Sequence, residues 1–126
     1  MAGSSITVTH QEPAPAVGVL VATCVADDDD GSFPDTVLPA IDGQLLSIIT
    51  DPGTPAPTAA YDVSVLDADG FDRLGGAGAD RSATVTERAA VSGAFVGRRE
   101  ALTLHLENNS EDGAVTVVTI HYTQRV

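Results

Sequence analysis

The residues best suited to chemistry are three aspartates, Asp67, Asp69 and Asp72, which form the pattern DxDGxD. Carboxylates at alternate positions of a loop can converge on a hard cation, as they do in calcium-binding loops. A complete EF-hand loop also requires a glutamate at its twelfth position, and Gly78 occupies that position here. A turn in which Asp and Gly satisfy the backbone accounts for the same residues. We therefore expect a structural turn, with the three aspartates as weak metal candidates.

A second acidic run, residues 27–30, offers four consecutive aspartates. It could gather calcium in the same way, but water and salt screen such charges in an exposed loop, so we favour a solvated turn. His10, His105 and His121 are too far apart in the sequence to form a local metal motif. We expect His105 and His121 to face each other across a final hairpin, where cross-strand pairing explains them.

The candidate nucleophiles lack partners in the sequence. Ser82 is not in a GxSxG turn. Cys24 is the single cysteine, so it has no intrachain disulfide partner, and within an apolar run it is expected to be a core residue. The glycine-rich segment LGGAGA, residues 74–79, is not followed by the Lys-Ser/Thr of a phosphate-binding loop. We predict no catalytic residues, no cofactor and no enzymatic activity.

Charge and length limit the classes of partner. The 126 residues carry a net charge of −12, with six arginines and no lysine. A nucleic-acid surface needs a dense basic stripe and an anionic membrane repels an acidic chain, so we expect neither partner. The charge favours solubility, or docking on a basic partner. The length fits one domain, and the longest apolar run, residues 16–26, is too short to span a bilayer.

Residues 17–26 form the strongest predicted strand. Val17, Val19, Val21 and Val25 face one way, whereas Leu20, Ala22 and Cys24 face the other. Because both faces are apolar, we expect a central strand or one covered by a partner.

Further alternation predicts strands at residues 6–9, 43–50, 61–66, 81–87, 101–107 and 114–123. Residues 33–38 are expected to lead into another short strand, and residues 89–100 have strand character with two glycine breaks. Proline-rich breaks are expected at residues 11–15 and 51–57, and residues 102–123 are predicted to form a hairpin. No stretch has a helical apolar period. The predicted fold is all-β, a β-sandwich or a tulip-like or jelly-roll-like small barrel of seven to nine short antiparallel strands. Residues 1–16 are predicted to be an N-terminal arm and residues 17–126 a single β domain.

The stretch YDVSVLDADGFDRLGGAGADRSATVTE, residues 61–87, resembles segments of small virion proteins of tailed bacteriophages. Those segments combine a YDV strand, a D-x-D-G-x-D turn, a glycine-rich stretch, an N/D-R-S element and a closing T-x-E-like element. GQLLSIITDPGTPAP upstream and LTLHLENNSEDGAVTVVTIHY downstream fit the same pattern, so the resemblance covers about residues 17–123. Asp80 stands where the family often has asparagine.

The resemblance implies an accessory structural protein of the virion, a capsid decoration or cement protein. Such a protein is assembled in the host cytoplasm, forms a homo-oligomer and binds the major capsid protein or other virion subunits. A tail or head-fibre component is a close variant. The residues themselves leave a second class open, a β-sandwich binding module for carbohydrate or calcium. Its acidic loops are present, but the chain has only three Phe, two Tyr and no Trp for an aromatic platform.

Overall fold

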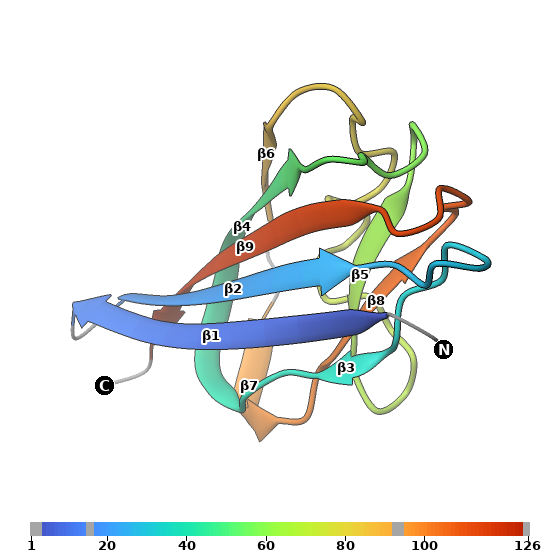
Figure 1. The fold of residues 1–126 in the computed structure, drawn as a ribbon. Helices are drawn as coiled ribbons and strands as arrows, with labels where there is room; N and C mark the ends of the chain where they lie inside the picture. The colour runs from blue at the N-terminus through green and yellow to red at the C-terminus, as the bar shows by residue number, and fades with distance from the viewer. Residues whose placement is uncertain (1–3, 15–16, 92–94, 125–126) are drawn as a thin grey trace.

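The computed structural model describes residues 4–14, 17–91 and 95–124, which form nine strands in two antiparallel sheets (Figure 1). Sheet A has the order β1-β2-β9-β4-β6, and β7 also pairs with β4. Its strands are β1 (Ser5–Ala14), β2 (Val17–Val25), β4 (Ile41–Pro52), β6 (Glu87–Ala90), β7 (Phe95–Glu100) and β9 (Val115–Gln124). Sheet B has the order β3-β8-β5, with β3 (Thr36–Val37), β8 (Thr103–Glu107) and β5 (Asp62–Leu66).

The two sheets confirm the predicted all-β sandwich. The described strands do not close into the alternative barrel, because sheet A ends at β1 on one side and at β6 on the other. Within the same residues, no helix has the length and apolar character needed to cross a membrane.

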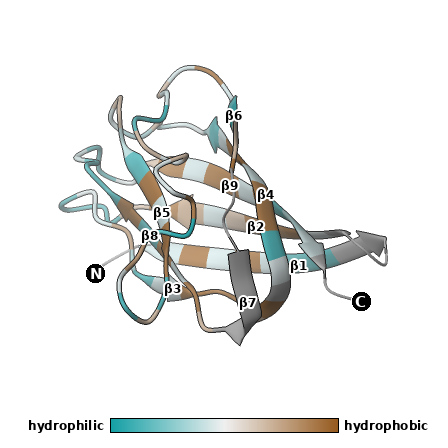
Figure 2. Cartoon of the chain, turned by 180° about the vertical axis from the view of Figure 1, so that it is seen from behind, coloured by the Kyte–Doolittle hydropathy of each residue, from teal (hydrophilic) through white to brown (hydrophobic). Residues whose placement is uncertain are grey.

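The core lies between the two sheets and is built by period-two alternation. On β8 and its flank, Leu102, Leu104 and Leu106 are buried, as predicted, and Val63 and Val65 of β5 lie beside them. The facing side chains of sheet A are Leu20, Ala22 and Cys24 from β2 and Val118, Ile120 and Tyr122 from β9. The alternation of hydrophobic and hydrophilic residues can be followed along β5 and β9 in Figure 2.

The strand predicted at residues 17–26 is confirmed as β2, which lies between β1 and β9. Its Leu20, Ala22 and Cys24 face the core. Its other face carries Val19 and Val21, which are only half-buried, because the described residues place no further layer over that side of sheet A.

The predicted final hairpin is wrong. β8 pairs with β3 and β5 in sheet B, whereas β9 pairs with β2 and β4 in sheet A. Residues 108–113 therefore cross from one sheet to the other. His105 and His121 belong to different sheets and do not form a cross-strand pair.

The return strand predicted at residues 81–87 is also wrong, although Arg81 does bridge to Tyr61. Ser82 Oγ accepts hydrogen bonds from the backbone N–H groups of Thr84 and Val85, both at 3.1 Å. The Glu87 carboxylate accepts the Ser82 N–H at 2.7 Å. These side-chain acceptors replace the ladder of a strand and turn the chain, so that β6 begins only at Glu87.

Two predicted breaks lie partly inside strands. β1 continues beyond Thr9 to Ala14, with a shift of register between Gln11 and Ala14. The sequence of β1 can include a proline because β1 is an edge strand, in which not every backbone N–H has to donate to a neighbouring strand. β4 likewise continues through Pro52. The predicted boundary between arm and domain falls between residues 16 and 17, next to residues 15–16, which lie outside the described residues.

Candidate interaction surfaces

Asp67 is held within its own turn. Its Oδ1 accepts the backbone N–H groups of Asp69 and Phe71, both at 2.9 Å, and its Oδ2 pairs with Nε of Arg73 at 2.9 Å. The Phe71 hydrogen bond, followed by the one from Arg73, lowers the pKa of the Asp67 carboxyl. Gly70 completes the turn with a φ of +80°.

Asp72 performs a similar role for the next segment. Its Oδ1 accepts the N–H groups of Val65 and Leu74, each at 3.0 Å, and its Oδ2 accepts the N–H of Gly76 at 3.1 Å. The carboxyl of Asp69, by contrast, lies on an exposed residue. Two of the three metal candidates thus use their oxygens for the backbone, which is the turn chemistry expected of them.

The glycine-rich segment covers the free edge of β5. Arg73 N–H donates to the carbonyl of Val65 at 2.7 Å, and Val63 N–H donates to the carbonyl of Gly78 at 2.8 Å. A Cβ at Gly78 would lie 2.1 Å from the carbonyl oxygen of Val63, so only glycine permits the approach. The backbone of this glycine-rich loop therefore satisfies the N–H and C=O groups of a strand edge.

The second acidic run also forms a turn. Asp27 is buried, and its Oδ1 accepts the N–H groups of Asp29 at 2.7 Å and Asp30 at 3.3 Å. Oxygen atoms of Asp27, Asp28 and Asp29 lie within 4.8 Å of one another, the one such acidic or metal-ligating group among residues 4–14, 17–91 and 95–124. The turn geometry explains the run without a ligand.

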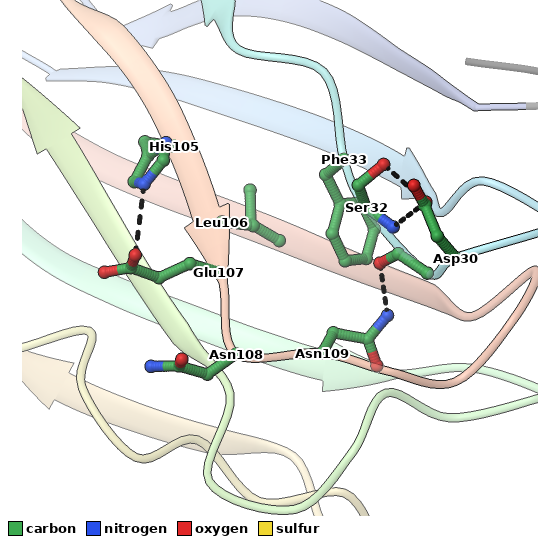
Figure 3. Close-up of a pocket in the computed structure, with 9 residues that line it drawn as sticks. Asp30, Ser32, Phe33, His105, Leu106, Glu107, Asn108 and Asn109 are labelled. Carbon is green, nitrogen blue, oxygen red and sulfur yellow. Dashed lines mark hydrogen bonds and ion pairs between the residues drawn. The ribbon is translucent and has the colours of Figure 1, made fainter.

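A shallow polar cleft of about 360 Å³ lies between the turn after β2 and the end of β8 (Figure 3). His105, Glu107 and Asn109 line one side, and Asp30 and Phe33 line the other. A second hollow, of about 420 Å³, adjoins it beyond His105 and Glu107, over the outward face of β5.

His105, like Glu107, is a titratable group that lines both hollows. Its Nδ1 lies 2.6 Å from a carboxylate oxygen of Asp35, and its Nε2 lies 3.5 Å from one of Glu107. The hydrogen bond with Asp35 is the main reason that the pKa of His105 is raised, against a smaller opposing effect of burial. No sequence pattern indicates this contact, because Asp35 and His105 are brought together only by the pairing of β3 with β8.

An ion pair joins the buried Arg81 to the partly exposed Glu87, and it is not among the contacts predicted from the sequence. The side chain of Arg81 is 6% exposed, and its guanidinium meets a carboxylate oxygen of Glu87 at 3.0 Å and the carbonyl of Ala77 at 2.8 Å. The sequence feature that could have indicated the pair is the closing TVTE element. Its glutamate, Glu87, pairs with Arg81 and accepts the backbone N–H of Ser82.

The outer face of sheet A is the broadest uncharged surface. We define it by half-buried residues of three adjacent strands: Val19, Val21 and Val25 of β2, Val115, Val117 and Thr119 of β9, and Ile49 of β4. Register places Val21 opposite Thr119 and Thr119 opposite Ile49, so the side chains form a continuous band. Charged residues enter only at the margin, with Asp51 beside Val117 and Arg88 beside Ile49.

Cys24 is a core residue, as predicted. It is fully buried, and burial raises the pKa of its thiol to about 12. A thiol with so high a pKa is protonated at neutral pH and is a poor nucleophile.

No protein-family model matches the sequence, and no curated protein matches it significantly. Among solved structures, a chain described as "Cyanophage Pam1 capsid asymmetric unit" aligns with 98% of this chain and 87% of its own length, at 19% identity and a TM-score of 0.35. A TM-score this low does not establish a shared fold, so the role of the chain has to be argued from its own residues.

Proposed function

We propose that this chain is a structural protein of a phage virion, without catalytic activity, which decorates the capsid and stabilises it by bridging shell subunits. The observation that carries the proposal is the outer face of sheet A. A strand of a two-layer sandwich needs one apolar face, yet β2 has Val19 and Val21 on the side that no other described layer covers. An uncharged β-branched band of this kind suits a permanent partner.

The charge of the chain favours a particular kind of partner. The residues that define the outer face of sheet A are all uncharged, and Asp51, opposite Val117, is an acidic residue at its margin in a chain of net charge −12. A shell surface with an apolar centre and basic rim would complement this arrangement. Burial of the β-branched side chains would then supply affinity, at about 25 cal/mol per Å² of apolar surface removed from water. The surrounding acidic residues would steer docking.

The sequence resemblance of residues 61–87 to small phage virion proteins supports the same role. In the structure, the Asp67 and Asp72 carboxylates of this stretch accept backbone hydrogen bonds that stabilise a turn and the loop covering the edge of β5, so both residues have a structural role. The resemblance thus concerns the architecture of the domain, and the outer face of sheet A is where we place the contact with the shell.

The test is co-sedimentation of the purified chain with shells that lack it. We expect Val21→Asp and Val117→Asp each to weaken binding at least tenfold, because each buries an unpaired carboxylate in the interface. Val85→Asp is the matched control, since Val85 is 56% exposed in the loop before β6. Shell binding that is absent for the wild type, or unaltered in both sheet A variants, would contradict the proposal.

A β-sandwich binding module is the second candidate, because the cleft beside His105 is lined by Asp30, which directly follows the cluster of Asp27, Asp28 and Asp29. Such a module would bind a glycan in the cleft or calcium at the acidic turn. We expect the melting temperature to change little on addition of millimolar calcium or of a chelator. A large rise with calcium that Asp28→Asn abolishes would favour the binding module.

A further inference from the structure

We infer that two copies of this chain pair through the free edge of β1, in antiparallel register, so that sheet A continues from one copy into the other. The inference concerns the isolated chain and does not depend on binding to a shell. It rests on a comparison of the sheet edges, on the composition of β1 and on the distribution of charge.

The edges of sheet B are closed or short. The edge of β5 is covered by residues 67–81, through the backbone contacts of Val63 and Val65 and the bridge from Tyr61 to Arg81. β3 contains only two residues, Thr36 and Val37. Neither edge offers a row of free N–H and C=O groups long enough to hold another strand.

The edges of sheet A differ from each other. On one side, β6 is four residues long and begins with Glu87 and Arg88, and β7 is six residues long. Charged side chains of this kind protect an edge against pairing. On the other side, β1 spans ten residues, and no described strand pairs with its outer edge.

β1 lacks the usual protection of an edge strand. Residues 5–11, SITVTHQ, contain no formally charged side chain at neutral pH and no proline, and Ile6, Thr7, Val8 and Thr9 are all β-branched. β-Branched residues have high strand propensity, and a neutral edge admits a second strand. The first charge and the first proline, Glu12 and Pro13, follow this segment.

The edge is also held in position for pairing. Residues 5–11 are in continuous antiparallel register with β2, from Ser5 opposite Val25 to Gln11 opposite Val19. Ile6 and Val8 pack against the core, and the imidazole of His10 contacts the hydroxyl of Tyr122. A strand already fixed in this way loses little conformational entropy when a partner adds to it.

A second copy is the partner that the charges favour. Two chains of net charge −12 repel each other least where neither presents a charge, and residues 5–11 are such a place. A two-fold axis perpendicular to the sheet brings Thr7 and Thr9 of one copy next to the same residues of the other. Cross-strand threonine pairs are favourable, and two-fold contacts are the commonest in homo-oligomers.

This arrangement also joins the two outer faces of sheet A. Because the axis is perpendicular to the sheet, Val19 and Val21 of both copies lie on the same side of one continuous sheet. The uncharged band is thereby doubled in width.

The experiment measures the molar mass of the full chain by sedimentation equilibrium over a range of concentrations. We expect a dimer for the wild type. Thr7→Glu/Thr9→Glu and Thr7→Lys/Thr9→Lys should each raise the dimer dissociation constant at least tenfold, because like charges then face each other. An equimolar mixture of the two variants should recover dimers, since opposite charges face each other in the mixed pair. Thr23→Glu, on the same face but on β2, is the matched control and should remain dimeric.

Melting curves of both double variants verify that the isolated fold is retained. A wild type that stays monomeric at all concentrations would overturn the inference. So would dimers that persist unchanged in either double variant, since they would have to form elsewhere. If both variants melt like the wild type and their mixture still fails to dimerise, pairing through β1 is also excluded. Loss of shell binding with dimerisation intact would count against the proposed function alone.

Discussion

Tyr122 of β9 lies over Gly18, its register partner on β2. A Cβ at position 18 would be 2.0 Å from Cζ of the Tyr122 ring. The ring therefore crosses β2 above the glycine, and its hydroxyl reaches the imidazole of His10 on β1. The Tyr122 side chain thus links β9 to the edge strand β1 by passing over β2, and it contacts all three of these strands of sheet A.

We expect Gly18→Ala to lower the free energy of unfolding by about 1–3 kcal/mol, because the added methyl group forces the buried ring out of its position. Chemical denaturation of the full chain measures the effect. In the background of Tyr122→Leu the same substitution should cost much less, and additive costs in the double variant would show that the ring is not the obstacle.

The second prediction concerns how much the ion pair of Arg81 and Glu87 contributes to stability. Glu87→Ala leaves a guanidinium that is 6% exposed without its carboxylate and removes the acceptor of the Ser82 N–H. Because Glu87 itself is partly exposed, we expect a loss of about 2–3 kcal/mol in the free energy of unfolding, below the cost of breaking a fully buried pair. Glu111→Ala, at an exposed residue in the loop before β9, is the control and should be near neutral. Equal effects of the two substitutions would contradict this role.

The acidic turn allows a comparison between two neighbouring aspartates. Asp72→Ala removes the acceptor for three backbone N–H groups, those of Val65, Leu74 and Gly76, and should cost about 2 kcal/mol or more. Asp69→Ala changes an exposed side chain and should cost little. Thermal unfolding with and without a chelator measures both. A metal site would reverse this pattern, with both aspartates important and the chelator as damaging as either substitution.

Local patterns in the sequence predicted which side chains are buried, but not which strands pair. The alternation of Leu102, Leu104 and Leu106 correctly places them inward, because side-chain direction follows from strand geometry alone. The same alternation exists whether β8 pairs with β9 or with β5. Residues 108–113 are long enough to cross between sheets, and the core contacts on both sides decide the outcome.

The loop at residues 82–86 shows a different limit. Thr84, Val85 and Thr86 have high strand propensity, yet Ser82 Oγ takes the N–H groups of the first two. The two hydrogen bonds that this hydroxyl accepts, together with the one accepted by the Glu87 carboxylate, outweigh a strand propensity worth fractions of a kcal/mol per residue. The contact of His105 with Asp35 could likewise not be predicted from local sequence patterns, because the two residues are 70 positions apart.

The pH dependence of stability should reflect His105. Folding raises the pKa of this histidine, mainly through its hydrogen bond with Asp35, so the folded state holds the proton more tightly than the unfolded state. The stabilisation is fully present below the ordinary pKa of 6.5 and is lost as the pH rises through the higher pKa of the folded state.

We therefore expect the difference in unfolding free energy between the wild type and His105→Gln to shrink as the pH is raised from about 6 to 8. Denaturant titrations at a series of pH values measure this difference, in which the titration of the other groups largely cancels. Asp35→Asn should remove most of the pH dependence. A difference that stays constant, or grows with pH, would contradict the assignment.

The most direct measurement of the central claim is a cryo-electron microscopy difference map between phage shells with and without this protein. The proposal predicts regular density on the outside of the shell, at positions that bridge neighbouring subunits, with the outer face of sheet A turned toward the shell. Density on the tail or on a head fibre would place the chain elsewhere in the virion. No ordered density at saturating protein, or density in which Val19, Val21 and Val117 face solvent, would contradict the proposed decoration of the capsid through this face.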